Sequence, residues 1–297
     1  MEPVGRFFED FQLGQVLRHQ SHGPVTIAQA QGNTTLTGGM WPGGQLDDVL
    51  TFNLVFGLSV ADISLHAVAN LGYAQGRFGV PLEVGDVLAV HSQVIGLREV
   101  SSRKAGVVYV HTRAHNQHGH EVLQYKRWVL VNKRQPGDPA TPLPPAQVPE
   151  LPALGAGRIY LPDAPPLTLC AGSAMLAEDQ HQQLTRLFHN PARLHFEPAA
   201  SPYGRCLVYG GVVIALAHRL ALPDLYNGRP GRISAIFGGA HHHPVFAGDV
   251  IYAALTRLAD GRVVLWARKN APFEVGAQPD PADPDLVLEW DISVTPV

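Results

Sequence analysis

One short stretch of this 297-residue chain combines side chains that could move a proton. Four residues separate Asn190 from His195, and Pro191 lies between them. A neutral imidazole can take a proton from water and return it near neutral pH, whereas an amide can only orient the water. Because Pro191 follows a helix-like run from Ser173 to Leu187, we expect a helix followed by a loop that presents Asn190 and His195 to a shared cleft. The alternative is that Asn190 caps the helix and His195 caps a turn.

The elements that position this loop occur twice in the sequence. An apolar segment at 50–60 precedes a Gly-Asp turn at Asp86, and a second at 207–218 precedes one at Asp249, which predicts two long buried helices. Patterns typical of strands follow each turn, at 87–97, 106–113, 122–131, 250–258, 263–269 and 286–295. A long helix wrapped by antiparallel strands, present twice, predicts an α+β double hotdog with one continuous sheet. The alternative is a chance match, since Gly-Asp turns are common.

A proline-rich stretch at 135–166 divides the chain into halves of similar length. Proline fixes φ and removes a backbone donor, so this stretch is expected to be an extended connector. We therefore predict an N-terminal hotdog at 1–134, a linker at 135–166 and a C-terminal hotdog at 167–297. Because no histidine occurs between His22 and His66, the first hotdog lacks a counterpart of the loop described above, and we expect the second to be catalytic.

The loop and the glycines after it resemble the MaoC-type (R)-specific enoyl-CoA hydratases. That family has an Asp-x-Asn-Pro-x-His loop and then a glycine turn that opens its central helix. The resemblance implies that His195 is the catalytic histidine and that Asn190 takes the place of the catalytic aspartate. It also implies that the N–H of Gly210 polarises the thioester carbonyl, with Gly211 in support and Tyr209 beside the substrate. A helix N-terminus suits this role because its N–H groups are free and its dipole is positive.

Asparagine in place of aspartate changes the expected chemistry. An amide is no base, so His195 would carry both proton transfers or share them with another group, while Asn190 orients the water. The first hotdog is then expected to shape the pocket for the acyl chain or the CoA tail, which leaves one active site per chain.

Longer blocks resemble the family of mesaconyl-CoA hydratases, also called β-methylmalyl-CoA dehydratases. The blocks are residues 7–15, 46–48, 68–78, 106–110, 125–129 and 239–249. The resemblance implies a lyase that reversibly hydrates a 2-enoyl-CoA thioester, with mesaconyl-CoA converted to β-methylmalyl-CoA. Segment 25–45 is shorter and richer in glycine than is usual in that family, which bears on acyl-chain specificity.

Three other functions remain open from the sequence. An (R)-specific straight-chain enoyl-CoA hydratase, or 3-hydroxyacyl-CoA dehydratase, would share the site and differ in pocket shape. A hotdog thioesterase would normally place a carboxylate on the central helix, and residues 211–218 contain none. A non-catalytic acyl-CoA sensor would need an additional partner-binding segment, and the sequence shows none.

Further candidates for substrate binding are basic side chains. Arg77, Arg193 and Lys269 could bind the free carboxylate of a dicarboxylic acyl group or the CoA phosphates, and the planar guanidinium suits a carboxylate. His241 is a further substrate-binding candidate, because it matches a family position and precedes the second Gly-Asp turn.

No metal or organic cofactor is expected. The chain has 15 histidines, including His241–His243 and a group at 111, 115, 118 and 120. Adjacent residues on a strand point to opposite faces, and no carboxylate or cysteine accompanies either group at metal-site spacing. No glycine-rich phosphate loop follows a strand, so we predict neither a flavin nor a nicotinamide.

Composition narrows the class of protein further. With 22 Lys+Arg against 25 Asp+Glu, the net charge is -3, which argues against nucleic-acid binding. The chain shows no signal peptide and no apolar run of membrane-spanning length. Its two cysteines, Cys170 and Cys206, suit a reducing compartment, so we expect a cytoplasmic protein. Hotdog sheets often pair edge to edge. The alternative is that the two halves satisfy this pairing within one chain, and we expect a homodimer of such chains.

Overall fold

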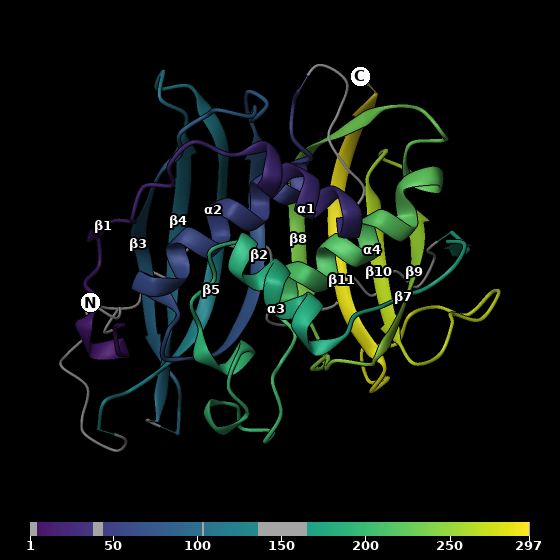
Figure 1. Cartoon of the computed structure of the whole chain (residues 1–297). Coiled ribbons are helices and arrows are strands. Elements are labelled where there is room, and N and C mark those ends of the chain that lie inside the picture. Colours follow the sequence, from purple (N-terminus) through teal and green to yellow (C-terminus); the bar gives the residue numbers. More distant parts are fainter. Residues whose placement is uncertain (1–4, 38–43, 103, 136–164, 297) are drawn as a thin grey trace.

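The computed structural model describes residues 5–37, 44–102, 104–135 and 165–296 (Figure 1). One antiparallel sheet runs through the molecule in the order β1-β3-β4-β5-β2-β8-β11-β10-β9-β6, and β7 pairs with β9. The strands are β1 (Val16–Arg18), β2 (Ala67–Phe78), β3 (Ala89–Glu99), β4 (Ala105–His115), β5 (Glu121–Asn132), β6 (Thr168–Leu169), β7 (Ala174–Met175), β8 (Gly231–His241), β9 (Val250–Arg257), β10 (Val263–Lys269) and β11 (Leu286–Pro296).

The helices lie on one face of this sheet (Figure 1). They are α1 (Ile27–Thr37), α2 (Asp48–Ile63), α3 (Glu178–Leu187) and α4 (Gly210–Leu225), with short 3-10 turns η1 (Phe8–Asp10), η2 (Arg193–His195) and η3 (Pro198–Ala200). The two predicted apolar segments form α2 and α4, which are buried on nearly all sides as their lack of charge requires. Asp47 starts α2 by accepting a hydrogen bond from the Val49 amide at 2.6 Å.

The two halves of the chain meet where β2 pairs with β8. Tyr73 lies opposite Gly239, and Arg77 lies opposite Ala235. Strands β1–β5 come from the first half of the chain and β6–β11 from the second, so the sheet is continuous across this junction. Residues 136–164 of the predicted linker lie outside the described residues.

The sequence interpretation missed β2 and β8, the two strands at the junction. Both contain internal glycines, and neither alternates between buried and exposed residues along its whole length, so the two-residue period of a strand is obscured. The helix expected over 173–187 begins only at Glu178. Ala174 and Met175 instead pair with β9, and the acidic residues Glu178 and Asp179 occupy the first turn of α3.

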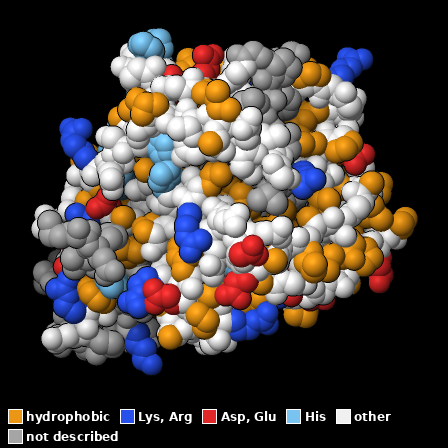
Figure 2. All heavy atoms as spheres, in the orientation of Figure 1, with side chains coloured by type: hydrophobic (Ala, Val, Ile, Leu, Met, Phe, Trp, Pro, Cys, Tyr) orange, Lys and Arg blue, Asp and Glu red, His pale blue; other side chains and the backbone are white. Residues whose placement is uncertain are grey.

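Charged side chains are interspersed on the face shown in Figure 2, with Lys and Arg among Asp and Glu. None of the helices in the described part of the chain is long and apolar enough to cross a bilayer.

Candidate active site

The end of α3 places Asn190. His189 has a φ of +58°, in the left-handed region, and its N–H donates to the Arg186 carbonyl at 2.9 Å. The Asn190 N–H reaches back to the Thr185 carbonyl at 3.1 Å. These two bonds form the Schellman motif that closes a helix, so His189 rather than Asn190 takes the left-handed position. The Asn190 backbone completes the helix end, which leaves its carboxamide for other contacts.

The Asn190 carboxamide is held in place by the next turn. The side chain is buried, with 4% of its surface exposed, and its Oδ1 accepts from the Ala192 amide at 3.0 Å. Among the described residues, this is the only hydrogen bond to that carboxamide. Its Nδ2 group is therefore available to donate to a water molecule or a substrate.

His195 ends the 3-10 turn η2 and is also buried, with 6% exposed. Its Nδ1–H donates to the Leu207 carbonyl at 2.7 Å, because a carbonyl oxygen can only accept. This bond selects the tautomer in which Nε2 carries the lone pair. Burial lowers the pKa of His195 to about 4, so the ring is neutral at neutral pH. In this arrangement Nε2 can accept a proton from a bound water molecule.

Two glycines open α4 without a capping side chain. Tyr209 is the N-cap and makes no side-chain cap bond, and Gly210 and Gly211 are the first two residues of the helix. Within the described part of the chain, neither glycine amide has a hydrogen-bond acceptor. Free N–H groups at the positive end of a helix can bind an oxygen that gains negative charge.

Both positions require glycine because neighbouring side chains approach closely. A Cβ on Gly210 would lie 2.6 Å from Nε2 of His241, and one on Gly211 would lie 2.0 Å from Oδ1 of Asn53. Asn53 belongs to α2 and donates through Nδ2 to the Gly211 carbonyl at 3.0 Å. The Tyr73 hydroxyl lies 2.8 Å from the His241 Nε2, so the first half of the chain contacts Gly211 through Asn53 and reaches Gly210 only through His241.

The predicted site residues fall into two groups. The rings of His195 and Tyr209 lie 5.6 Å apart, and His241 adjoins Gly210, so these residues surround the N-terminus of α4. Arg193 lies apart from them: its side chain is 72% exposed and binds Glu197 at 2.6 Å. Arg77 is also exposed.

Lys269, another carboxylate candidate, already has a partner. Its Nζ donates to the Pro244 carbonyl at 2.7 Å. The described residues contain no group of three or more His, Cys, Asp or Glu side chains that could hold a metal ion.

Asn53 and Tyr73 were not identified from the sequence. A signal for Asn53 was present, since a lone amide in an otherwise apolar helix must find a polar partner. Tyr73 lies in the block at 68–78, yet only the pairing of β2 with β8 shows that its hydroxyl reaches His241.

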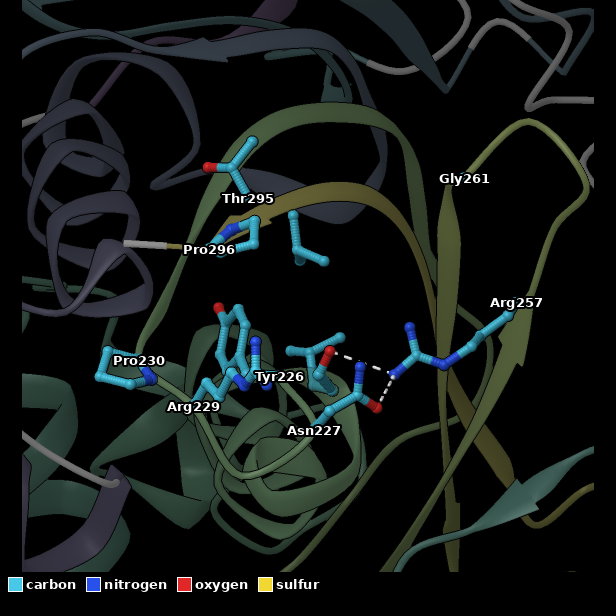
Figure 3. Close-up of a pocket in the computed structure, with 10 residues that line it drawn as sticks. Tyr226, Asn227, Arg229, Pro230, Arg257, Gly261, Thr295 and Pro296 are labelled. Atoms are coloured by element: carbon cyan, nitrogen blue, oxygen red, sulfur yellow. Dashed lines mark hydrogen bonds between the residues drawn. The ribbon is translucent and has the colours of Figure 1, made fainter.

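A cavity of about 500 Å³ lies at the other end of β8 from His241 (Figure 3). It is lined by Leu225, Tyr226, Asn227, Arg229, Pro230, Arg257, Gly261, Val294, Thr295 and Pro296. Arg257 donates to the Leu225 carbonyl at 3.2 Å and closes the C-terminus of α4. None of the predicted site residues lines this cavity, so it is separate from the candidate active site.

Comparisons with known proteins define the class. No family model matches the chain. A solved MaoC domain dehydratase of Chloroflexus aurantiacus superposes with a TM-score of 0.84 at 36% identity, covering 99% of this chain and 98% of that one. A Mycobacterium tuberculosis protein described as a double hotdog superposes with a TM-score of 0.69 at 21% identity, covering 98% and 99%. The chain is therefore a double hotdog protein of the MaoC type, as its sequence predicted.

Two curated relatives narrow the class to a family. β-Methylmalyl-CoA dehydratase of Chloroflexus aurantiacus is 38% identical, over 98% of this chain and 96% of the relative. Mesaconyl-CoA hydratase of Cereibacter sphaeroides is 39% identical, over 84% of this chain and 82% of the relative. The chain belongs to this family of MaoC-like hydratases and dehydratases, and the predicted resemblance is confirmed.

Proposed function

We propose that this protein is a hydro-lyase that reversibly adds water to a 2-enoyl-CoA thioester, with mesaconyl-CoA as substrate and β-methylmalyl-CoA as product. The observation that carries the proposal is the neutral His195 ring, with Nδ1–H bound to the Leu207 carbonyl, beside a helix that begins with two free glycine amides. The names of the two relatives support the same substrate and product.

The amides of Gly210 and Gly211 bind the thioester oxygen. Addition of water to Cβ moves electrons onto that oxygen and gives an enolate, so donors aimed at it lower the barrier. The interaction strengthens as negative charge develops, which is the condition for catalysis rather than binding alone.

His195 then carries both proton transfers. Its Nε2 takes a proton from the water as the water oxygen bonds to Cβ, and Nε2–H returns that proton to Cα as the enolate collapses. The low pKa of His195, about 4, favours return of the proton. Nδ2 of Asn190 donates to the water and directs its lone pair, while Oδ1 stays bound to the Ala192 amide.

The two halves of the chain have different roles in this proposal. The C-terminal hotdog, 167–297, supplies the proton-transfer and oxyanion groups. The N-terminal hotdog, 1–134, shapes the substrate pocket from α2 and β2, which supply Asn53 and Tyr73. Arg77 and Arg193 are exposed and remain candidates only for the CoA phosphates.

We further propose a cytoplasmic homodimer. Cys170 and Cys206 are unpaired, which suits a reducing compartment. The edges of a hotdog sheet offer unpaired backbone groups for association. Light scattering on the purified protein tests the dimer, and a monomeric mass would contradict it.

The proposed reaction is tested by incubating the purified protein with mesaconyl-CoA and measuring the masses of the products by mass spectrometry. A product heavier by one water, formed by the wild type and not by His195→Ala, is expected. Activity on crotonyl-CoA alone would make the protein a straight-chain hydratase, and release of free CoA would make it a thioesterase. No turnover of either substrate would overturn the enzyme assignment.

A further inference from the structure

Arg127 is a fully buried arginine beneath α2. It lies on β5, opposite Tyr73 of β2 in the strand register, and none of its surface is exposed. Its guanidinium carbon lies 4.3 Å from the centre of the Phe56 ring. Arg127 thus projects from the sheet of the first half of the chain toward the helix that contacts α4.

The guanidinium of Arg127 makes a single side-chain hydrogen bond among the described residues. Nη2 donates to Oγ of Ser59 at 3.0 Å, whereas Nε and Nη1 have no hydrogen-bond partner. None of the ion pairs among the described residues includes Arg127. Burial lowers the pKa of Arg127, yet a guanidinium keeps its proton in proteins. A buried cation without a counter-charge is costly, and it therefore indicates a missing anion.

Two tyrosine hydroxyls that interact electrostatically with this cation can also donate hydrogen bonds. The hydroxyls of Tyr125 and Tyr209 are buried without a hydrogen-bond partner, and both interact electrostatically with Arg127. Burial raises the pKa of both tyrosines, so both hydroxyls keep their protons. The group made by Arg127, Tyr125 and Tyr209 is therefore rich in donors, which suits a ligand with several acceptors.

Ring contacts connect this group to the proposed catalytic residues. Phe56, which stacks on Arg127, lies 5.8 Å from the Tyr209 ring, and Tyr209 lies 5.6 Å from the His195 ring. Tyr209 also directly precedes Gly210, whose amide binds the thioester oxygen in the proposed mechanism. An anion bound between Arg127 and Tyr209 would therefore lie close to the residues proposed to act on the acyl group.

We propose that Arg127 binds the free carboxylate of a dicarboxylic acyl-CoA, with the Tyr209 hydroxyl as a second donor, and so selects dicarboxylic over uncharged acyl groups. The inference rests on the proposed hydratase function and deepens it. In mesaconyl-CoA the free carboxylate is attached to the carbon that receives the water oxygen, so its binding also orients that carbon toward His195. Arg127 takes the carboxylate-binding role first considered for Arg77, Arg193 and Lys269.

The first test is direct binding to the wild type by calorimetry. Succinyl-CoA and butyryl-CoA both carry a saturated four-carbon acyl group. The acyl group ends in a carboxylate in succinyl-CoA and in a methyl group in butyryl-CoA. We expect succinyl-CoA to bind about 100-fold more tightly, since hydrogen bonds to a buried charge are strong. Equal affinities would overturn the inference whether or not the protein turns over mesaconyl-CoA.

The second test is the variant Arg127→Met, compared with Arg127→Lys and with Lys126→Met as a matched control. Lys126 directly precedes Arg127 on β5, so its side chain lies on the opposite face of the strand. Its Nζ donates to Oε1 of Gln75. We expect kcat/KM for mesaconyl-CoA to fall by about 100-fold in Arg127→Met, with partial recovery in Arg127→Lys. Turnover of crotonyl-CoA, which has no carboxylate, should be preserved or raised.

The outcomes separate this inference from the proposed function. An equal loss on both substrates, or no loss on either, would overturn the role of Arg127 while leaving the hydratase in place. A wild type that does not hydrate mesaconyl-CoA would overturn the proposed reaction instead. If Arg127→Met does not fold, Arg127→Lys and the calorimetric comparison still decide the question.

Discussion

Gly57 of α2 lies directly against the carbonyl of Phe188, the C-cap residue of α3. A Cβ added to Gly57 would lie 1.7 Å from the Phe188 oxygen and 3.2 Å from the Asn190 nitrogen. The helix from the first half of the chain is therefore the surface on which the loop of the second half rests. Neither half positions Asn190 alone.

Replacing Gly57 by alanine should displace this loop. The Phe188 carbonyl is backbone and cannot rotate away, so α2 and the loop must separate, at a cost of about 1–3 kcal/mol of unfolding free energy. A shift of about 1 Å at Asn190 should lower kcat roughly 100-fold. Gly23→Ala is the control, because a Cβ there meets nothing within 4 Å. Unchanged kcat in Gly57→Ala would show that the loop does not depend on this contact.

The pH dependence of the reaction should report the burial of His195. Its pKa of about 4 means that the base form is already dominant at pH 6, so kcat/KM should be flat from pH 6 to 8 and fall below about 5. His195→Gln should lower kcat by about 100- to 10,000-fold at every pH, with little change in melting temperature. An acid limb with a midpoint near 6.5 would contradict the buried, neutral imidazole.

Buried histidines should also make the fold sensitive to acid. Burial lowers the pKa of His195 and His218 to about 4, against 6.5 for the unfolded chain. Their contribution to stability is therefore complete above about pH 6.5 and is lost as the pH falls toward 4, by up to about 3 kcal/mol for each residue. Denaturant unfolding between pH 4 and 8 measures it. Removal of an exposed turn histidine, His118→Asn, should leave this profile unchanged.

The buried carboxyl of Asp47 should have the opposite effect on the pH dependence of stability from that of the buried histidines. Burial raises its pKa from 3.8 to about 7, so the folded state holds a proton that the unfolded state releases. Stability is lost as the pH rises from about 4 to 7. Asp47→Asn keeps the oxygen that accepts from Val49 and removes the charge, so the variant should gain stability over the wild type across that range and hold the gain above pH 7. A variant less stable than the wild type at pH 8 would show that the charged cap is favourable.

Local sequence patterns were enough to predict much of the architecture. The apolar segments at 50–60 and 207–218 have no face for solvent, so they had to form the buried helices α2 and α4. Proline after Asn190 and two glycines after Tyr209 likewise indicated where a helix ends and another begins, because proline and glycine restrict or free the backbone wherever they occur.

Only the tertiary structure decided which side chains meet. His189 rather than Asn190 takes the left-handed position, a backbone conformation that the sequence pattern does not specify. Gly57 faces Phe188, and Tyr73 reaches His241, and both contacts join residues that are distant in sequence. Arg127 is the clearest case. In the strand predicted at 122–131 it is one of three polar or charged residues, with Gln124 and Lys126. Its importance comes from lacking a counter-ion, which depends on every chain segment packed around it. Sequence patterns report local preferences, whereas the partners of a buried charge are a property of the whole fold.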